Sequence, residues 1–184
     1  MKNILRATLA SAALILSVST ISPVFAACDA TTNNASEGGF LQTCSREPDE
    51  VIITGAMTLK EIETSLPSYS AQFQDYNADK AAIKQLQQIS TPTQVVVAFG
   101  TWCPDSQRET PRFMKLLKQV NNPNITVKFI AVDHDLKDPK GLAAPYKIDN
   151  VPTFIVQQQQ KTLGTIIEKP TVSLEKDLLN ILAK

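Results

Sequence analysis

The chain has 184 residues, with 18 basic and 18 acidic side chains and therefore no formal net charge at neutral pH. This balance gives no electrostatic footprint for binding nucleic acid or an anionic membrane surface, so neither is expected as a partner. The length suits one globular domain with a sizeable hydrophobic core, preceded by an extension.

The first segment has the pattern of a secretory signal. Lys2 and Arg6 give it a basic start, a short apolar stretch follows, and Pro23 breaks that stretch. The small residue at Ala26 predicts cleavage after this position. Because the apolar stretch is short and interrupted by Ser and Thr, an uncleaved anchor helix is the less favoured alternative. Residues 1–26 are therefore predicted to be a signal peptide of a periplasmic protein, with no membrane span after cleavage.

Three cysteines in an exported chain leave at least one without a partner in the same molecule. Cys28 and Cys44 flank a stretch rich in Thr, Asn, Ser and Gly, and a disulfide between them would contribute about 3 kcal/mol by constraining the unfolded chain. Alternatively, Cys44 is a resolving thiol for Cys103. A third possibility is a lipid anchor at Cys28, since Phe25 to Cys28 resembles a bacterial lipobox with Phe where Leu is usual.

Residues 27–78 are predicted to form an N-terminal extension. It begins as an irregular arm punctuated by Gly and Pro. The β-branched run 51–54 then predicts a short edge strand. Thr58 and Glu61 have the spacing of a capping box, which predicts a short helix that ends before Pro67.

The remaining segment, residues 79–184, is predicted to be the main domain. Its helices are indicated by apolar residues at intervals of three and four, and its strands by short apolar or alternating runs. The unbroken run Val95–Phe99 predicts a central strand buried on both faces. The predicted elements are a helix at 79–91, a strand at 95–99, a helix at 104–120, a strand at 125–132, a helix from 138 to 146, strands at 151–156 and 163–167, and a helix at 174–182. This order is typical of an α/β fold on a mixed sheet.

A reactive cysteine is indicated where the first central strand leads into a helix, in Trp102-Cys103-Pro104-Asp105-Ser106. The thiolate is the nucleophilic form of cysteine, and the free amides and dipole at a helix N-terminus favour it. Ser106 is expected to donate its hydroxyl to the sulfur anion, whereas the carboxylate of Asp105 opposes a second negative charge. The motif predicts a modestly acidic, nucleophilic Cys103.

This motif, the proline Pro111 within the following helix, and Val151-Pro152-Thr153 before a strand together resemble the thioredoxin superfamily over about residues 79–184. Glu109-Thr110-Pro111 is similar to the exported, TlpA-like branch. The resemblance implies a thioredoxin-like α/β fold, with a central mixed β-sheet flanked by helices.

The same resemblance implies a substrate-binding surface beside the sulfur. Pro152 would be a cis-proline lying against Cys103, and the backbone of Val151 would pair with a bound polypeptide as an added strand. The expected substrate-binding residues are Trp102, Pro104, Val151, Pro152 and Thr153.

Two positions depart from the thioredoxin pattern. Ser106 stands where a second cysteine would complete the redox pair, and Val97 stands where thioredoxins carry a buried acid. Exchange itself needs only one attacking sulfur. The predicted function is therefore thiol-disulfide exchange or isomerisation on cysteine-containing polypeptides, with Cys103 and Ser106 catalytic and with glutathione, a partner protein or Cys44 resolving the mixed disulfide.

Two other functions remain open. The same groove would serve a non-catalytic module that binds extended polypeptides. Alternatively, Arg108 and Arg112 would support a Cys103 peroxidase, although Gly100 stands where peroxiredoxins carry a threonine. His134 between two aspartates is more typical of a solvated turn than of a metal ligand. No metal and no cofactor are expected, and the oligomeric state is not indicated.

Overall fold

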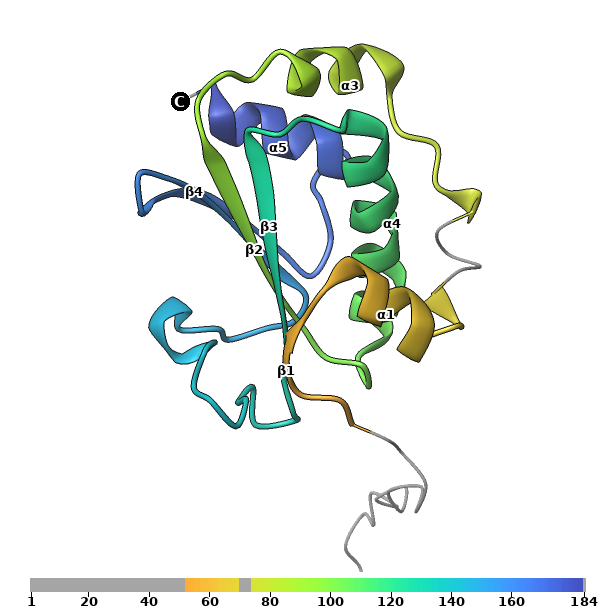
Figure 1. Cartoon of the computed structure of the whole chain (residues 1–184), viewed down its shortest axis with the longest axis vertical. Helices are drawn as coiled ribbons and strands as arrows, with labels where there is room; N and C mark the ends of the chain where they lie inside the picture. The colour runs from red at the N-terminus through yellow and green to blue at the C-terminus, as the bar shows by residue number, and fades with distance from the viewer. Residues whose placement is uncertain (1–51, 70–73, 184) are drawn as a thin grey trace, which may run out of the picture. The chain divides into compact units, whose positions relative to one another are not determined.

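The computed structural model describes residues 52–69 and 74–183, and a mixed five-stranded sheet organises this part of the chain (Figure 1). The strands lie in the order β1-β3-β2-β4-β5. Strands β2 and β3 are parallel, and the pairs β1/β3, β2/β4 and β4/β5 are antiparallel. The strands are β1 (Gly55–Met57), β2 (Thr93–Phe99), β3 (Ile125–Ala131), β4 (Thr153–Gln158) and β5 (Lys161–Ile167). The predicted α/β fold with a central mixed sheet is confirmed.

The register of the parallel pair fixes where the functional residues lie. Phe99, the last residue of β2, pairs with Ala131, the last residue of β3. Parallel strands end at the same edge of a sheet, so the segments that follow these two residues start side by side. The predicted central position of β2 is confirmed, because Val95 to Phe99 are all fully buried.

Helices accompany the sheet, and local sequence explains where they begin. Thr58 and Glu61 form the predicted capping box, in which each side chain bonds the backbone of the other. Asp79 accepts from the amides of Ala81 and Ala82 and so caps the next helix, as N-cap carboxylates do. The helices are α1 (Leu59–Ser65), α3 (Lys80–Gln87), α4 (Pro104–Val120) and α5 (Leu174–Leu182).

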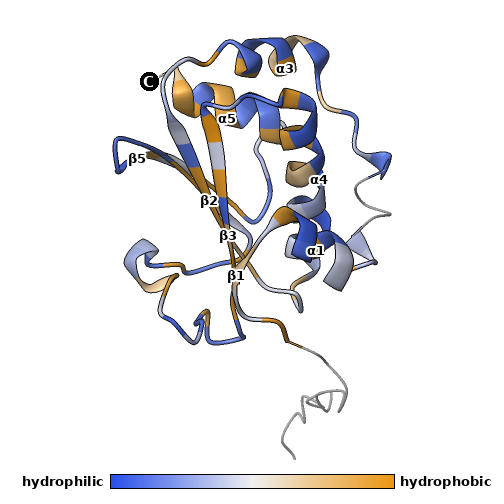
Figure 2. Ribbon diagram, in the orientation of Figure 1, coloured by the Kyte–Doolittle hydropathy of each residue, from blue (hydrophilic) through white to orange (hydrophobic). Residues whose placement is uncertain are grey.

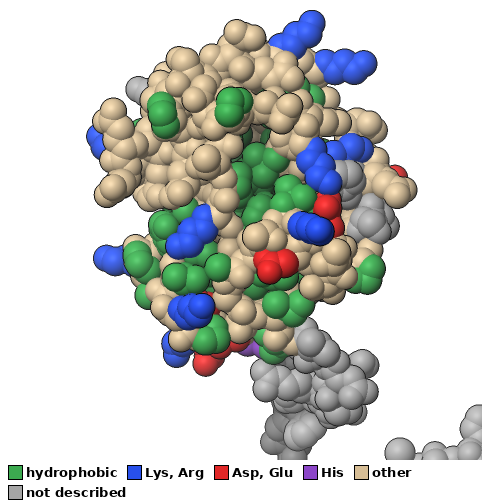
Figure 3. Space-filling view, viewed as in Figure 1, with side chains coloured by type: hydrophobic (Ala, Val, Ile, Leu, Met, Phe, Trp, Pro, Cys, Tyr) green, Lys and Arg blue, Asp and Glu red, His purple; other side chains and the backbone are tan. Residues whose placement is uncertain are grey.

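The main hydrophobic core lies between these helices and one face of the sheet (Figures 1 and 2). Phe113 of α4 contacts Phe154 of β4 with ring centroids 5.0 Å apart, and Phe99 meets Phe129 edge to face. The space-filling view shows hydrophobic side chains in the middle of this side of the molecule, with charged side chains spread around them (Figure 3). The buried side chains of α4 therefore pack in the core, and the first turn of this helix lies at the edge of the sheet where β2 ends.

The opposite face of the sheet is covered by an irregular segment between β3 and β4. The helix predicted at 138–146 is wrong, because only the short 3-10 helix η1 (Ala144–Tyr146) forms there. The carboxylate of Asp138 accepts from the amides of Lys140 and Ala143 at 3.0 and 2.8 Å. Such side-chain bonds satisfy amides that a helix would otherwise use, so the backbone follows a turn instead.

The chain before α3 joins the same sheet. The edge strand predicted at 51–54 forms slightly later, as β1 at Gly55–Met57, and Val51 lies outside the described residues. The backbone amide of Ile53 donates to Thr101 Oγ1 at 3.3 Å. Residues 52–69, which the sequence assigns to the N-terminal extension, thus contribute a strand and a helix to this fold.

Candidate redox site at Cys103

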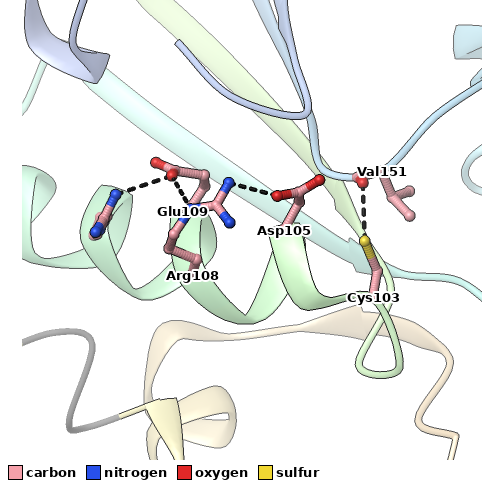
Figure 4. A network of polar contacts seen from close by, with 6 residues as sticks. Cys103, Asp105, Arg108, Glu109 and Val151 are labelled. Atoms are coloured by element: carbon pink, nitrogen blue, oxygen red, sulfur yellow. Dashed lines mark hydrogen bonds and ion pairs between the residues drawn. The ribbon is translucent and has the colours of Figure 1, made fainter.

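Cys103 lies at the point where β2 passes into α4 (Figure 4). It is the N-cap of α4, with φ −84° and ψ 123°, and Pro104 occupies the first turn. Its amide donates to the carbonyl of Gly100 at 3.1 Å, and its carbonyl accepts from the amide of Gln107 at 2.9 Å. The sulfur therefore lies at the amino end of a helix, where free amides and the dipole favour negative charge.

The sulfur contacts the backbone of a segment far away in the sequence. Cys103 Sγ donates a hydrogen bond to the carbonyl of Val151 at 3.1 Å, and the peptide bond between Val151 and Pro152 is cis. Only 9% of Cys103 is exposed. Since a thiolate has no proton to donate, this bond belongs to the protonated thiol. The fold thus brings Cys103, Val151 and Pro152 together, as the resemblance implies.

The hydroxyls of two other predicted site residues are bound elsewhere. Ser106 is fully buried, and its Oγ accepts from the amide of Gly100 at 3.1 Å. Within residues 52–69 and 74–183, no hydrogen bond joins Ser106 to Cys103. Thr153 donates to the carbonyl of Asn150 at 2.6 Å. Both hydroxyls therefore fasten the turns that carry the site, and the predicted bond from Ser106 to the sulfur is not part of this arrangement.

Trp102 is held on two sides. Its Nε1 donates to the carbonyl of Val132 at 3.1 Å, and its ring stacks on the His134 imidazole with centroids 4.2 Å apart. The prediction that His134 belongs to a plain solvated turn missed this contact. The register of the parallel strands would have predicted this contact, because Trp102 and His134 each follow the end of a parallel strand by three residues. The half-buried side chain of Trp102, adjacent to Cys103 in the chain, is thus fixed by these two contacts.

A row of charged side chains follows the cysteine on α4 (Figure 4). Arg108 bonds Asp105 Oδ1 at 2.5 Å and Glu109 Oε1 at 2.7 Å. Arg112 bonds the same Glu109 oxygen at 3.0 Å. Both arginines that the sequence proposed as anion holders for a peroxidase are therefore bound to carboxylates. The two positive charges that favoured a peroxidase are thus engaged in ion pairs within α4.

Tyr69 carries a buried hydroxyl that the sequence did not single out. The residue is only 3% exposed, and its hydroxyl has no hydrogen-bond partner among the described residues. Burial raises the pKa of Tyr69 well above its ordinary value, and a negative charge on Cys103 raises it further. The hydroxyl therefore stays protonated and uncharged. Val97, where thioredoxins carry an acid, is fully buried among apolar residues.

Replacement of Tyr69 by phenylalanine is expected to raise the free energy of unfolding by about 1 kcal/mol, because it removes a buried hydroxyl without a partner. The matched control is Tyr76→Phe. Tyr76 donates to Glu175 Oε2, so this variant loses a hydrogen bond and is expected to be less stable by about 1 kcal/mol. Urea unfolding of both variants checks the opposite signs. Equal effects would show that the Tyr69 hydroxyl has a partner.

No group of three or more His, Cys, Asp and Glu side chains within residues 52–69 and 74–183 is arranged to hold a metal ion. In the same part of the chain, no helix is long and apolar enough to cross a membrane. Cys28, Cys44 and the predicted signal peptide 1–26 lie outside the described residues, so the disulfide, the lipid anchor and the cleavage site stay predictions.

Comparison with known proteins identifies the family. The family model described as "Thioredoxin" matches residues 58–176. A comparison with curated protein sequences gave no match. The chain is similar in structure to a protein of unknown function from Pseudomonas aeruginosa, with 21% identity, coverage of 65% of this chain and 73% of that chain, and a TM-score of 0.47.

Two further solved structures are similar to this chain. Trxlp from Edwardsiella tarda is 19% identical, with 57% of this chain and 94% of that chain covered and a TM-score of 0.40. Oxidised mitochondrial thioredoxin 3 from Saccharomyces cerevisiae is 22% identical, with 59% and 98% covered and a TM-score of 0.38. The family match spans well over half of the 184 residues, including β2, α4 and the Cys103 turn. The chain belongs to the thioredoxin family.

Proposed function

We propose that this chain is an exported thioredoxin-family protein of the TlpA-like kind, in which Cys103 alone carries out thiol-disulfide exchange or isomerisation on cysteine-containing polypeptides. Family membership supports a thiol-disulfide role in general. The finer proposal rests on one observation, which is that Cys103 Sγ at the N-terminus of α4 lies 3.1 Å from the carbonyl of Val151. This geometry presents a nucleophile beside backbone that can pair with an extended chain.

The reaction is a pair of sulfur displacements. The Cys103 thiolate attacks one sulfur of a substrate disulfide, a new disulfide joins Cys103 to the substrate, and the other substrate sulfur leaves as a thiolate that takes up a proton. A second thiolate then attacks the substrate sulfur of the mixed disulfide and releases Cys103. If that thiolate belongs to the substrate, the result is isomerisation without net electron transfer. If it belongs to glutathione, the substrate sulfur is released from Cys103 as a glutathione mixed disulfide.

The test is refolding of a scrambled disulfide protein in a glutathione buffer. Wild type is expected to accelerate recovery of native disulfides, and Cys103→Ser is expected to fall to the rate of glutathione alone, because no attacking sulfur remains at the site. Lys118→Gln is a suitable control, since Lys118 lies at the far end of α4 and pairs with Glu63. If Cys103→Ser and wild type have equal rates, the catalytic proposal is wrong.

Cys44 is proposed as a second route for resolving the mixed disulfide. This route rests on Cys44 being one of the three cysteines of the chain. Its thiolate would attack Cys103 Sγ, which releases the substrate sulfur as a thiol and leaves a Cys44–Cys103 disulfide for glutathione to reduce. Cys44→Ser is then expected to lengthen the lifetime of the mixed disulfide, measured by acid quenching and mass spectrometry. An unchanged lifetime would leave resolution to glutathione or a partner.

A non-catalytic binding module is the second candidate. The observation that favours it is the environment of the sulfur, which is 9% exposed and donates a hydrogen bond to the carbonyl of Val151. In this case the Cys103→Ser variant would bind an unfolded, cysteine-free polypeptide as tightly as wild type, and neither would accelerate disulfide exchange. Fluorescence anisotropy of a labelled polypeptide measures this binding directly.

Export to the periplasm is part of the proposal. It is supported by the signal-like pattern of residues 1–26 and by the disulfide chemistry, which suits an oxidising compartment. Intact mass of the protein recovered from cell fractions, with and without reduction and alkylation, is expected to show a chain that starts at Ala27. The alkylation pattern before reduction distinguishes a Cys28–Cys44 disulfide from a free Cys44 thiol, and only the free thiol is compatible with the resolving role. A mass that includes a diacylglycerol would show a lipid anchor at Cys28 instead.

A further inference from the structure

Asp105, Arg108 and Glu109, near the start of α4, form two ion pairs that share Arg108, and we call this cluster the clamp. Arg108 lies at its centre and bonds Asp105 Oδ1 with one terminal nitrogen and Glu109 Oε1 with Nε (Figure 4). Its bonds to Glu109 and Asp105 raise the pKa of Arg108 above its ordinary value. The guanidinium of Arg108 is therefore charged, and carboxylates bind it on two sides.

The clamp includes a carboxylate that is close to Cys103 in the chain. Asp105 follows Cys103 by two residues in the first turn of α4, and a carboxylate near a cysteine is expected to oppose a second negative charge on the sulfur. The guanidinium of Arg108 is bound to this carboxylate and offsets its charge.

Glu109 fixes where the guanidinium lies. It is 2% exposed, and an ionised carboxylate at this depth is retained only where cations neutralise it. Arg108 and Arg112 both bond its Oε1, at 2.7 and 3.0 Å. A surface arginine would sample many rotamers, whereas this one is anchored to a buried group. The anchor directs the other side of Arg108 to Asp105.

We infer that Arg108, anchored by Glu109, is a positioning residue that neutralises Asp105 and thereby promotes formation of the Cys103 thiolate. Its importance for disulfide exchange rests on the proposed function, whereas its effect on the reactivity of the thiol stands without it. Arg108 acts through Asp105; within the described part of the chain its hydrogen bonds go to Asp105 and Glu109 and not to the sulfur.

Other titratable groups around the site are few among the described residues. Tyr69 lies before α3, and burial raises its pKa so that it stays neutral. His134, after β3, stacks on Trp102. The segment immediately before β4 contributes the carbonyl of Val151, which is uncharged, to the surroundings of the sulfur.

The experiment measures alkylation of Cys103 by iodoacetamide between pH 5 and 9, with the Cys103 peptide quantified by mass spectrometry. At pH 7, Arg108→Gln is expected to react about fivefold more slowly than wild type, since a partly exposed charge is left unopposed near the sulfur. Its pH profile is expected to move to higher pH. Asp105→Asn combined with Arg108→Gln is expected to restore the wild-type rate, because no carboxylate remains to be neutralised.

Lys118→Gln is the matched control, because it removes one positive charge and one ion pair from the far end of the same helix; its rate is expected to equal that of wild type. The inference is overturned if Arg108→Gln reacts like wild type, or if the double variant stays slow. Glu109→Gln provides a second check and is expected to slow alkylation in the same direction. If alkylation follows these expectations while disulfide refolding is not accelerated, the clamp stands and the proposed function fails.

Discussion

Replacement of Glu175 by alanine is expected to lower the free energy of unfolding by about 3 kcal/mol, because it leaves two half-buried donors, the Tyr76 hydroxyl and the Asp79 amide, without their acceptor. Glu175 is 3% exposed in the first turn of α5. Its Oε1 accepts from the amide of Asp79 at 2.9 Å, and its Oε2 accepts from the hydroxyl of Tyr76. Arg112 of α4 lies over the Tyr76 ring at 5.8 Å. The carboxylate thus connects α5 to the start of α3 and to Tyr76, and the Tyr76 ring in turn contacts Arg112 of α4.

The same carboxylate predicts a dependence of stability on pH. Burial acts to raise the pKa of Glu175, but hydrogen bonds from Asp79 N and Tyr76 hydroxyl outweigh it, so the pKa is lower than the ordinary value of 4.5. A lowered pKa in the folded state means that the carboxylate contributes stability above about pH 4.5, and this contribution is lost as the pH falls through the folded pKa.

Glu175→Gln isolates this contribution, since glutamine has nearly the same shape and does not titrate. The difference in unfolding free energy between wild type and Glu175→Gln is expected to be largest near pH 7 and to shrink towards pH 3. Urea unfolding at a series of pH values measures it. Glu63→Gln is the control, because Glu63 lies in an exposed pair with Lys118, where a small effect is expected. A difference that does not change with pH would contradict the role of the charge.

Replacement of Gly100 by alanine is expected to displace Trp102 and to destabilise the fold by about 2 kcal/mol, as overpacking of a filled site does. An added Cβ would lie 2.6 Å from Cε2 and 2.8 Å from Nε1 of the Trp102 ring. The ring would have to leave the carbonyl of Val132 and the His134 imidazole. Trp102 is the single tryptophan of the chain, so its fluorescence reports the change as a red shift.

A double-mutant cycle separates this clash from a general effect on the turn. In a Trp102→Ala background, the ring that obstructs the added methyl group is gone, so Gly100→Ala is expected to cost much less. Stability is then followed by circular dichroism. If Gly100→Ala costs the same in both backgrounds, the strain lies in the backbone of the turn and the contact with Trp102 is not its cause.

The sequence predicted those parts of the fold that local chemistry decides. Thr58 with Glu61, and Asp79 alone, marked two helix starts because N-cap bonds form between neighbours in the chain. The run from Val95 to Phe99 marked the central strand, since a strand buried on both faces has no room for polar residues. The position of Cys103 at the start of α4 followed from the same pattern.

The parts that the sequence did not predict depend on groups brought together by folding. Asp138 and Pro139 resemble a helix start, yet the Asp138 carboxylate bonds amides that hold a turn. The hydroxyl of Ser106 is bound by Gly100 within the turn. Glu175 contacts residues almost a hundred positions away, and no local pattern marks such a partner.

The irregular segment after β3 has a consequence for electrostatics. On the sheet face that it covers, Val96, Ile130 and Ile155 are buried near the Cys103 end, whereas Gln94 and Thr126 at the other end are exposed. The effective dielectric constant therefore changes along a single strand, low beside the sulfur and close to that of water at the opposite edge. A given charge acts more strongly at the sulfur end, so a charge introduced among Val96, Ile130 and Ile155 would have more influence on its neighbours than an equal charge beside Gln94 or Thr126.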